Sequence, residues 1–297
     1  MVTQTSFENP NFSSSFVFKR TFSQIFDTIK FEIVRNFRKF LLILGLYFVV
    51  FAIFFYNNFN TYSDPNNLLP ALSNDYILSY LDFAITIMIL VLAVVFGASI
   101  IVEDFEKQTG NLMFPNSTKL RLLTGRTIAA FILGSICLTF YYLLIGLDTF
   151  FFRNYSLPVE FYYSFFWAEL YFLMLLSFTI FFSSFSRSSS LVIILVVLLI
   201  LIVFTIIERL IPILGYEGEP LFILTYFSNI VTSILAYPAQ RSRLVTFEGR
   251  RSAGSGVGRQ FTFWSTPDPL GALLFMVGYT VIFLVLGYFL FERRQVQ

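Results

Sequence analysis

Six apolar runs divide this chain, and each approaches or reaches the length that crosses a bilayer as a helix. They cover residues 40–55, 81–101, 127–150, 161–182, 191–207 and 271–291. About 20 apolar residues in a helix span the ~30 Å hydrocarbon layer, and a helix satisfies its backbone hydrogen bonds internally, as lipid requires. The pattern therefore predicts an all-α polytopic membrane protein, in which residues 40–291 form a domain of six transmembrane helices.

A helical periodicity of another kind precedes the first run. Across residues 16–39 the apolar side chains recur every three or four positions, while the basic side chains lie mostly outside that stripe. A basic amphipathic helix of this kind lies in the interface of an anionic leaflet. We therefore expect a cytoplasmic interfacial helix, preceded by a disordered polar tail over residues 1–15. A helix of a soluble domain is the alternative, although no such domain follows. The residues expected to make the contacts of this helix are Phe18, Phe22, Phe26, Arg35 and Lys39.

The connection between the fifth and sixth runs, residues 208–270, is not uniform. Its residues 221–237 are apolar and lie between Pro220 and Pro238. A segment of about 17 residues is short for a span, so we expect it to be re-entrant or interfacial. The alternative is a seventh span, which would move the C-terminus to the other side of the membrane. Residues 240–260 are rich in Gly, Ser and Arg, a composition typical of a flexible loop.

Lysine and arginine in the short connections indicate the orientation. Short loops on the cytoplasmic side carry an excess of these residues. If the N-terminus is cytoplasmic, the short outer connections contain only Arg153. The inner side then contains Lys107, Lys119, Arg121, Arg126, Arg187, Arg293 and Arg294. We therefore expect a multi-pass protein of the plasma membrane with both termini in the cytoplasm, including the tail over residues 292–297.

Composition argues against several kinds of chemistry. The chain has a net charge of +2, no histidine and a single cysteine. Histidine is the commonest general base and metal ligand, and one cysteine cannot form a disulfide or a cysteine cluster within a chain. The nucleotide-binding pattern GxxxxGK followed by Ser or Thr is absent as well. We therefore expect no catalytic residue, metal site or bound cofactor, and no nucleic-acid partner.

Acidic residues in and beside the apolar runs are candidates for a transport path. Glu169 lies within the fourth run, where an acid costs roughly 2.5–3.5 kcal/mol on insertion scales. It is either a proton or substrate contact facing the protein interior or, if the span begins nearer residue 166, a residue of the outer interface. Four further acids lie at the outer ends of runs, either as an acidic vestibule that attracts cations or as isolated charges. They are Asp82, Asp148, Glu160 and Glu208.

The connection between the second and third runs, residues 102–126, is polar and charged and must lie outside the hydrocarbon. It nevertheless places three bulky apolar side chains together at residues 112–114. Exposed apolar clusters of this kind meet a partner or the headgroup region, so we expect a docking surface. A solvated loop that merely follows the charge rule is the alternative. The expected docking residues are Glu103, Asp104, Glu106, Thr109, Gly110, Leu112, Phe114, Pro115, Lys119 and Arg121.

These features together resemble the ABC-2 type of ABC exporter permeases of bacteria or archaea. The resemblance covers most of the chain. Its motif is an acid, then Thr-Gly, Leu, Pro and a basic residue, followed by Gly-Arg before an alanine-rich span. The matching residues are Glu106, Thr109, Gly110, Leu112, Pro115, Lys119, Gly125, Arg126, Ala129 and Ala130.

The resemblance implies a permease subunit that is not itself an enzyme. Its expected partners are separate ABC ATPase subunits that bind the ATP, a second permease copy or paralogue, and membrane lipids. The interfacial helix and the connection over residues 102–126 would dock on the ATPase subunits and couple ATP hydrolysis to substrate movement. The alternative function is a channel or an ion-gradient-driven transporter that uses Glu169 and the outer acids. An intramembrane enzyme and a non-transporting scaffold subunit are further alternatives.

Overall fold

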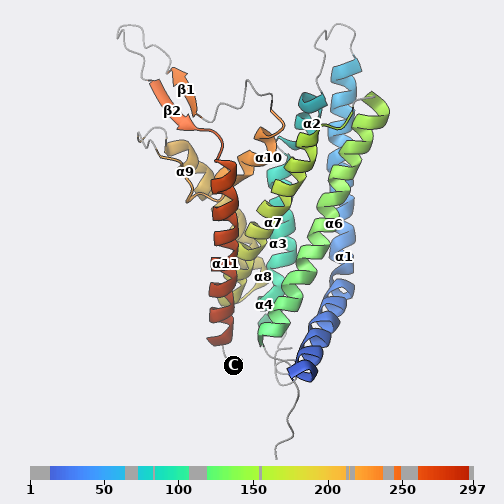
Figure 1. Ribbon diagram of the computed structural model, residues 1–297, viewed down its shortest axis with the longest axis vertical. Coiled ribbons are helices and arrows are strands. Elements are labelled where there is room, and N and C mark those ends of the chain that lie inside the picture. The colour runs from blue at the N-terminus through green and yellow to red at the C-terminus, as the bar shows by residue number, and fades with distance from the viewer. Residues whose placement is uncertain are drawn as a thin grey trace, which may run out of the picture.

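Most of the described chain forms long helices that lie side by side (Figure 1). The structure, a computed structural model, describes residues 14–63, 73–82, 84–106, 119–153, 156–211, 214, 218–236, 244–248 and 260–293. Its helices are α1 (Ser14–Ser63), α2 (Ser73–Leu81), α3 (Ala84–Gly97), α4 (Ser99–Glu106), α6 (Lys119–Arg153), α7 (Val159–Phe185), α8 (Ser189–Leu198), α9 (Thr205–Leu210), α10 (Asn229–Ser233) and α11 (Pro269–Arg293).

Six of the described helical segments are long and apolar enough to cross a membrane. They are Ser23–Asn60, Ile85–Glu103, Lys119–Phe151, Val159–Phe185, Ser189–Leu210 and Pro269–Arg293. Each contains or largely overlaps one of the six apolar runs, so the prediction of an all-α polytopic membrane protein is confirmed. Polar residues that flank the runs extend the helices, because a helix can continue beyond the hydrocarbon where water or headgroups solvate its side chains.

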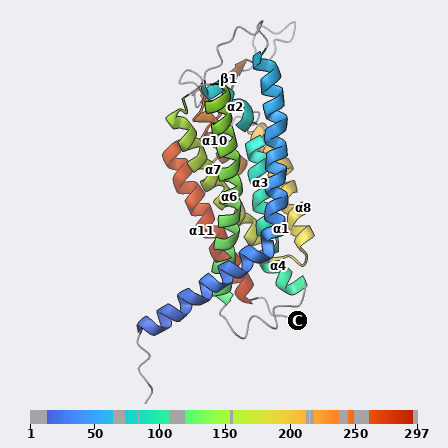
Figure 2. The same ribbon diagram turned by 90° about the vertical axis from the view of Figure 1, so that its right-hand side faces the viewer.

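The expected interfacial helix and the first span form one helix. α1 runs unbroken for 50 residues, and Figure 2 shows its N-terminal part turning away from the bundle. The residues of α1 include no proline, so nothing removes a backbone donor where the two parts join. No break in helical structure therefore marks the predicted boundary between residues 39 and 40.

The centre of the bundle is α7, which packs along α11 on one side and along α3 on another. α6 packs mainly along α1. Two glycines permit close approaches to α7. A Cβ at Gly97 would lie 2.9 Å from Cβ of Thr179, and a Cβ at Gly134 would lie 2.1 Å from Cζ of Phe172. In lipid, where apolar surface gains little by leaving the solvent, such small residues let helices pack closely.

We expect Gly134→Ala to lower the free energy of unfolding by about 1–3 kcal/mol, because the added methyl group overpacks a buried site. Phe172 is fully buried and its ring stacks on Phe131, so it has little room to yield. Gly278→Ala is the matched control, since a Cβ there meets nothing within 4 Å. Denaturant midpoints of the two variants in the same micelles would test this, and equal midpoints would contradict the close approach.

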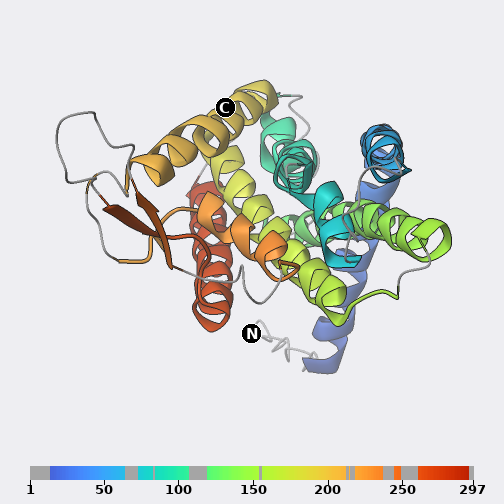
Figure 3. The same ribbon diagram turned by 90° about the horizontal axis from the view of Figure 1, so that it is seen from above.

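The apolar segment over residues 221–237 does not cross the bundle. It forms turns, a 3₁₀ helix at Thr225–Ser228 and the short helix α10, which lies over α7 (Figure 3). Ser164 of α7 donates a hydrogen bond of 2.8 Å to the backbone oxygen of Val231. The described part of the segment therefore contains no seventh span, which agrees with the expectation of a re-entrant or interfacial segment.

The stretch over residues 240–260, expected to be a flexible loop, contains one strand, and a second strand begins at its last residue. β1 (Leu244–Glu248) and β2 (Gln260–Trp264) pair antiparallel, with Leu244 opposite Trp264 and Glu248 opposite Gln260. Both strands are rich in β-branched and aromatic residues, a composition that favours strands. The Gly, Ser and Arg composition of residues 240–260 concealed the first of them. Residues 249–259 lie outside the described part of the chain.

Candidate functional site

The predicted docking residues that the structure describes lie at one end of the bundle, which we call the connection end. Here α4 finishes at Glu106, α6 begins at Lys119 and α11 finishes at Arg293, at the bottom of Figure 1. Five of the predicted residues lie outside the described residues: Thr109, Gly110, Leu112, Phe114 and Pro115. The same holds for the side chains of Phe18, Phe22 and Asp104. Phe26 is exposed on α1.

Four charged side chains form an ion-pair node at the connection end, defined by Glu32, Arg35, Glu103 and Arg126. Nε of Arg126 lies 2.8 Å from Oε1 of Glu32, and both side chains are almost completely buried. Nη2 of Arg35 lies 2.6 Å from Oε2 of Glu32 and 3.5 Å from Oε2 of Glu103. The node therefore joins α1 to α4, which leads into the connection, and to α6, which leaves it.

Hydrogen bonds complete the surroundings of the buried charges. Nη1 of Arg126 donates to the backbone oxygen of Ile100 over 2.7 Å, and Nδ2 of Asn36 donates to Oε2 of Glu32 over 3.2 Å. A buried ion pair offsets its loss of hydration only where the geometry is good and additional hydrogen bonds are made. The hydrogen bonds to Ile100 and from Asn36 supply the second of these conditions, and the node joins its three helices at this end.

Further contacts join the amphipathic part of α1 to α6 and to α4. Nη1 of Arg121 donates to Oε1 of Gln24 over 2.8 Å. A Cβ at Gly125 would lie 2.9 Å from Cβ of Thr28, so only a glycine lets the two backbones come this close. Lys39, another predicted residue, donates to Oγ of Ser99 over 3.2 Å. The predicted residues Arg121, Arg35 and Lys39 thus anchor α1 within the bundle.

The two residues that border the connection contact other helices. Nζ of Lys119 donates to the backbone oxygens of Phe291 and Glu292 at the end of α11, over 3.4 and 3.0 Å. Oε2 of Glu106 accepts hydrogen bonds from the backbone N–H and the hydroxyl of Ser189, over 3.3 and 2.6 Å, at the start of α8. The ends of the connection are therefore fixed to the fifth and the last spans.

Sequence reasoning missed Glu32 and did not place Arg126 among the docking residues. A signal for Glu32 was present, because it lies on the apolar stripe of the amphipathic helix, seven residues after Ile25 and three after Ile29. An acid among apolar positions of a basic helix predicts a buried partner of opposite charge. Which of the many arginines pairs with it depends on the packing of α1 against α6.

Glu169 lies inside the bundle. It is the eleventh residue of α7, which begins at Val159, and its Oε2 accepts a hydrogen bond of 2.6 Å from Oγ of Ser135 in α6. At 1.5 Å per residue it lies ~15 Å from the start of the helix, which favours the interior position over the outer interface. Its role as a transport-path acid stays a prediction.

The outer acids occupy separate places. Asp148 is buried, and its Oδ2 accepts hydrogen bonds from the hydroxyls of Tyr76 and Tyr80 over 2.5 and 2.6 Å. Burial, together with the hydrogen bond to Asp148, raises the pKa of the Tyr80 hydroxyl, which therefore remains a donor at neutral pH. Glu208 accepts from Thr225 and Asn229 at the re-entrant segment. The acidic vestibule stays a prediction.

Comparison with known protein families identifies the family of the chain. A sequence model of the family described as ABC-2 family transporter protein matches residues 31–296. The chain belongs to the ABC-2 transporter family. No curated protein matches the chain. As an ABC-2 permease it is a membrane subunit of an ABC transporter, a kind of subunit that is generally not catalytic. The matched residues contain the whole ion-pair node of the permease, so the node lies within the part of the chain that defines the family.

Proposed function

We propose that this permease is the membrane subunit of an ATP-driven exporter, and that separate ABC ATPase subunits bind its connection end. The ion pair of Glu32 with Arg126 carries the proposal. It joins the amphipathic part of α1 to the start of α6, seven residues after α6 leaves the connection over residues 107–118. A force applied to that connection would therefore move α1 and α6 together instead of bending a loose loop.

The proposed docking surface is the connection itself with the residues on either side of it. Three bulky apolar side chains in a polar loop, residues 112–114, favour contact with a protein surface. Glu103 and Arg121 flank the connection and are held against α1, so a docked partner would act on anchored helices. The remaining docking residues of the sequence analysis belong to the same proposed surface.

ATP enters this proposal through the partner. The chain contains no GxxxxGK pattern, so the ATPase subunit would bind and hydrolyse the nucleotide. Its closure would favour one of two arrangements of the connection end, and a second permease copy or a paralogue would form the other wall of the path. The connection end would face the cytoplasm of a plasma-membrane protein, with both termini on that side, because lysine and arginine gather there.

Purification of the tagged full-length permease from the membranes of the cells that produce it would test the proposal. We expect a stoichiometric partner that contains a GxxxxGK pattern, and ATP hydrolysis by the purified complex that is lost when the lysine of that pattern is replaced. Leu112→Asp should release the partner, because a charge enters the apolar docking cluster. Leu214→Asp is the matched control, since Leu214 is an exposed leucine outside the connection end.

Two results would contradict the proposal. One is movement of a solute by the purified permease alone in vesicles, which is the outcome expected of a channel or an ion-gradient-driven transporter. The other is labelling of a cysteine placed at position 110 from the cell exterior, since the docking surface would then face away from any ATPase.

A further inference from the structure

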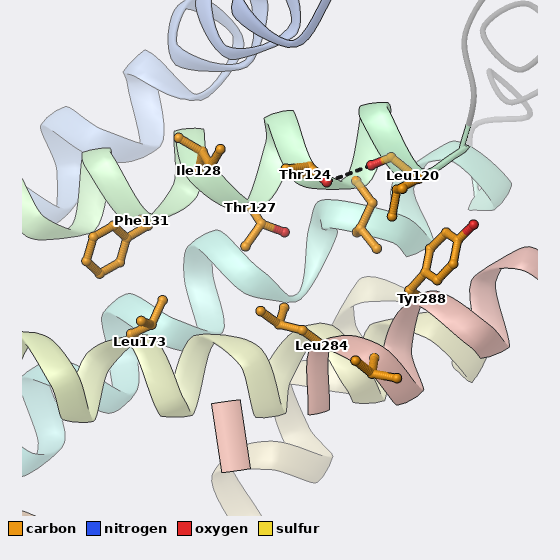
Figure 4. A pocket seen from close by; sticks show the side chains of 10 residues that line it. Leu120, Thr124, Thr127, Ile128, Phe131, Leu173, Leu284 and Tyr288 are labelled. Carbon is orange, nitrogen blue, oxygen red and sulfur yellow. Dashed lines mark hydrogen bonds between the residues drawn. The ribbon is translucent and has the colours of Figure 1, made fainter. Parts of the chain in front are cut away.

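An apolar groove of about 440 Å³ opens between α6 and α11 on the connection-end half of the bundle (Figure 4). α6 forms one wall, including Leu120, Thr127 and Phe131. α11 forms the other with Leu284 and Tyr288, and Leu173 of α7 forms the floor. The groove exists because α11 packs along α7 whereas α6 packs mainly along α1, so the two walls have few contacts with each other.

The length of the groove matches one leaflet. Its lining on α6 runs from Leu120 to Phe131, in steps of three or four residues that keep it on one face of the helix. Eleven residues of helix rise ~16 Å, about half of the ~30 Å hydrocarbon layer. α6 is apolar and long enough to span from Lys119 onward, including residues that the sequence alone placed outside the hydrocarbon, so the groove opens from the connection-end surface into the membrane.

One hydroxyl group in the lining of the groove has no hydrogen-bond partner in the part of the chain that the structure describes. The hydroxyl of Thr124 donates to the backbone oxygen of Leu120 over 2.8 Å (Figure 4). Oγ1 of Thr127, one turn deeper, is buried and has no hydrogen-bond partner among the described residues. A buried hydroxyl without a partner is unfavourable in an apolar setting. An oxygen of the glycerol linkage of a lipid would accept its hydrogen bond.

Basic side chains stand at the membrane-surface end of the groove. Lys119 precedes the lining residue Leu120, and its Nζ lies 5.5 Å from the centre of the Phe291 ring. Arg293 is exposed at the end of α11, next to the exposed acid Glu292. Lysine and arginine at a membrane surface attract anionic headgroups, and this position is where the phosphate of a lipid in the groove would lie.

We propose that this groove is a binding site for a membrane phospholipid. One acyl chain fills the space between α6 and α11, a linkage oxygen accepts from Thr127, and the phosphate lies at Lys119. The site lies on the outer surface of one chain and does not depend on ATP-driven export. The occupant is a bilayer lipid because the groove opens toward the membrane. Its apolar lining suits an acyl chain, and the basic side chains at its end suit an anionic phosphate.

Photolabelling would test this site in the full-length permease reconstituted into mixed phosphatidylcholine and phosphatidylglycerol vesicles. The probe is phosphatidylglycerol with a diazirine at the end of one acyl chain. We expect label on the peptides that contain Phe131 and Leu173, which line the deep end. Val285→Trp fills the groove and should reduce this label about tenfold, which corresponds to ~1.4 kcal/mol of binding free energy. Val281→Trp is the control, because Val281 is similarly exposed on α11 one turn away but does not line the groove.

The headgroup part has its own readout. Lys119→Gln should reduce the preference of the label for phosphatidylglycerol over a phosphatidylcholine probe, whereas Lys119→Arg should keep it. Equal labelling of Leu173 in the Val285→Trp and Val281→Trp variants, with both proteins at the wild-type unfolding midpoint, would overturn the proposal. So would cross-linking of Val285→Cys to a second copy in place of lipid labelling, since the face would then be a subunit interface.

Discussion

Arg126→Met is expected to lower the free energy of unfolding by about 1.5–3 kcal/mol, because it removes one of the charge partners of the buried Glu32 carboxylate and leaves Arg35. Glu32 and Arg126 are 3% and 3% exposed, so water cannot replace the lost interaction. The hydrogen bond from Arg126 to the backbone oxygen of Ile100 is lost as well. The measurement is the denaturant midpoint of the purified permease in micelles, with retained membrane insertion as a first check.

The double variant Glu32→Leu, Arg126→Met separates the charge effect from general damage. Replacing both partners of a buried ion pair by apolar residues is often neutral or stabilising, so we expect the double variant to recover most of the loss. Arg121→Gln is the control, since Arg121 lies five residues before Arg126 on α6 and also contacts α1 but hydrogen-bonds a neutral side chain, Gln24. A double variant as unstable as Arg126→Met would show that the node does not depend on the pairing of these two charges.

Leu112→Pro is expected to reduce the coupling between ATP hydrolysis and movement of the permease roughly 5–150-fold. This range corresponds to typical coupling free energies of about 1–3 kcal/mol. Proline removes a backbone hydrogen-bond donor and cannot continue a helix. A connection that contains it would bend instead of transmitting the movement of the ATPase subunit. ATP hydrolysis itself should persist, because the partner contains the nucleotide site. This prediction rests on the proposed function.

The measurement is the reactivity of a cysteine reporter, Leu214→Cys, in the complex with the ATPase subunits. Leu214 is 78% exposed and lies outside the connection end, and the native Cys137 is buried, so background labelling is low. ATP should change the labelling rate of the reporter in the otherwise unchanged permease and not in the Leu112→Pro variant. Leu112→Met is the control. A reporter that responds equally to ATP in all three proteins would contradict coupling through the connection.

The local pattern of the chain was enough to predict its spans and its family. An apolar run of sufficient length can satisfy its backbone in lipid only as a helix, so the six spans followed from composition and length. The re-entrant segment was predicted from its short length, about 17 residues, together with the prolines at both of its ends. The family followed from a short motif around Glu106, Gly110 and Arg126.

The pairing of distant residues required the packed structure. Glu32 is one of 18 acidic residues and Arg126 one of 20 basic ones, and nothing in their spacing joins them. They meet because glycine at position 125 lets α6 approach α1. The groove could not be predicted from the sequence either, because Thr127 and Tyr288 are far apart in the chain. They line one groove only because α6 packs mainly along α1 while α11 packs along α7. Periodicity and length act within a segment, whereas such sites depend on how whole helices fit against one another.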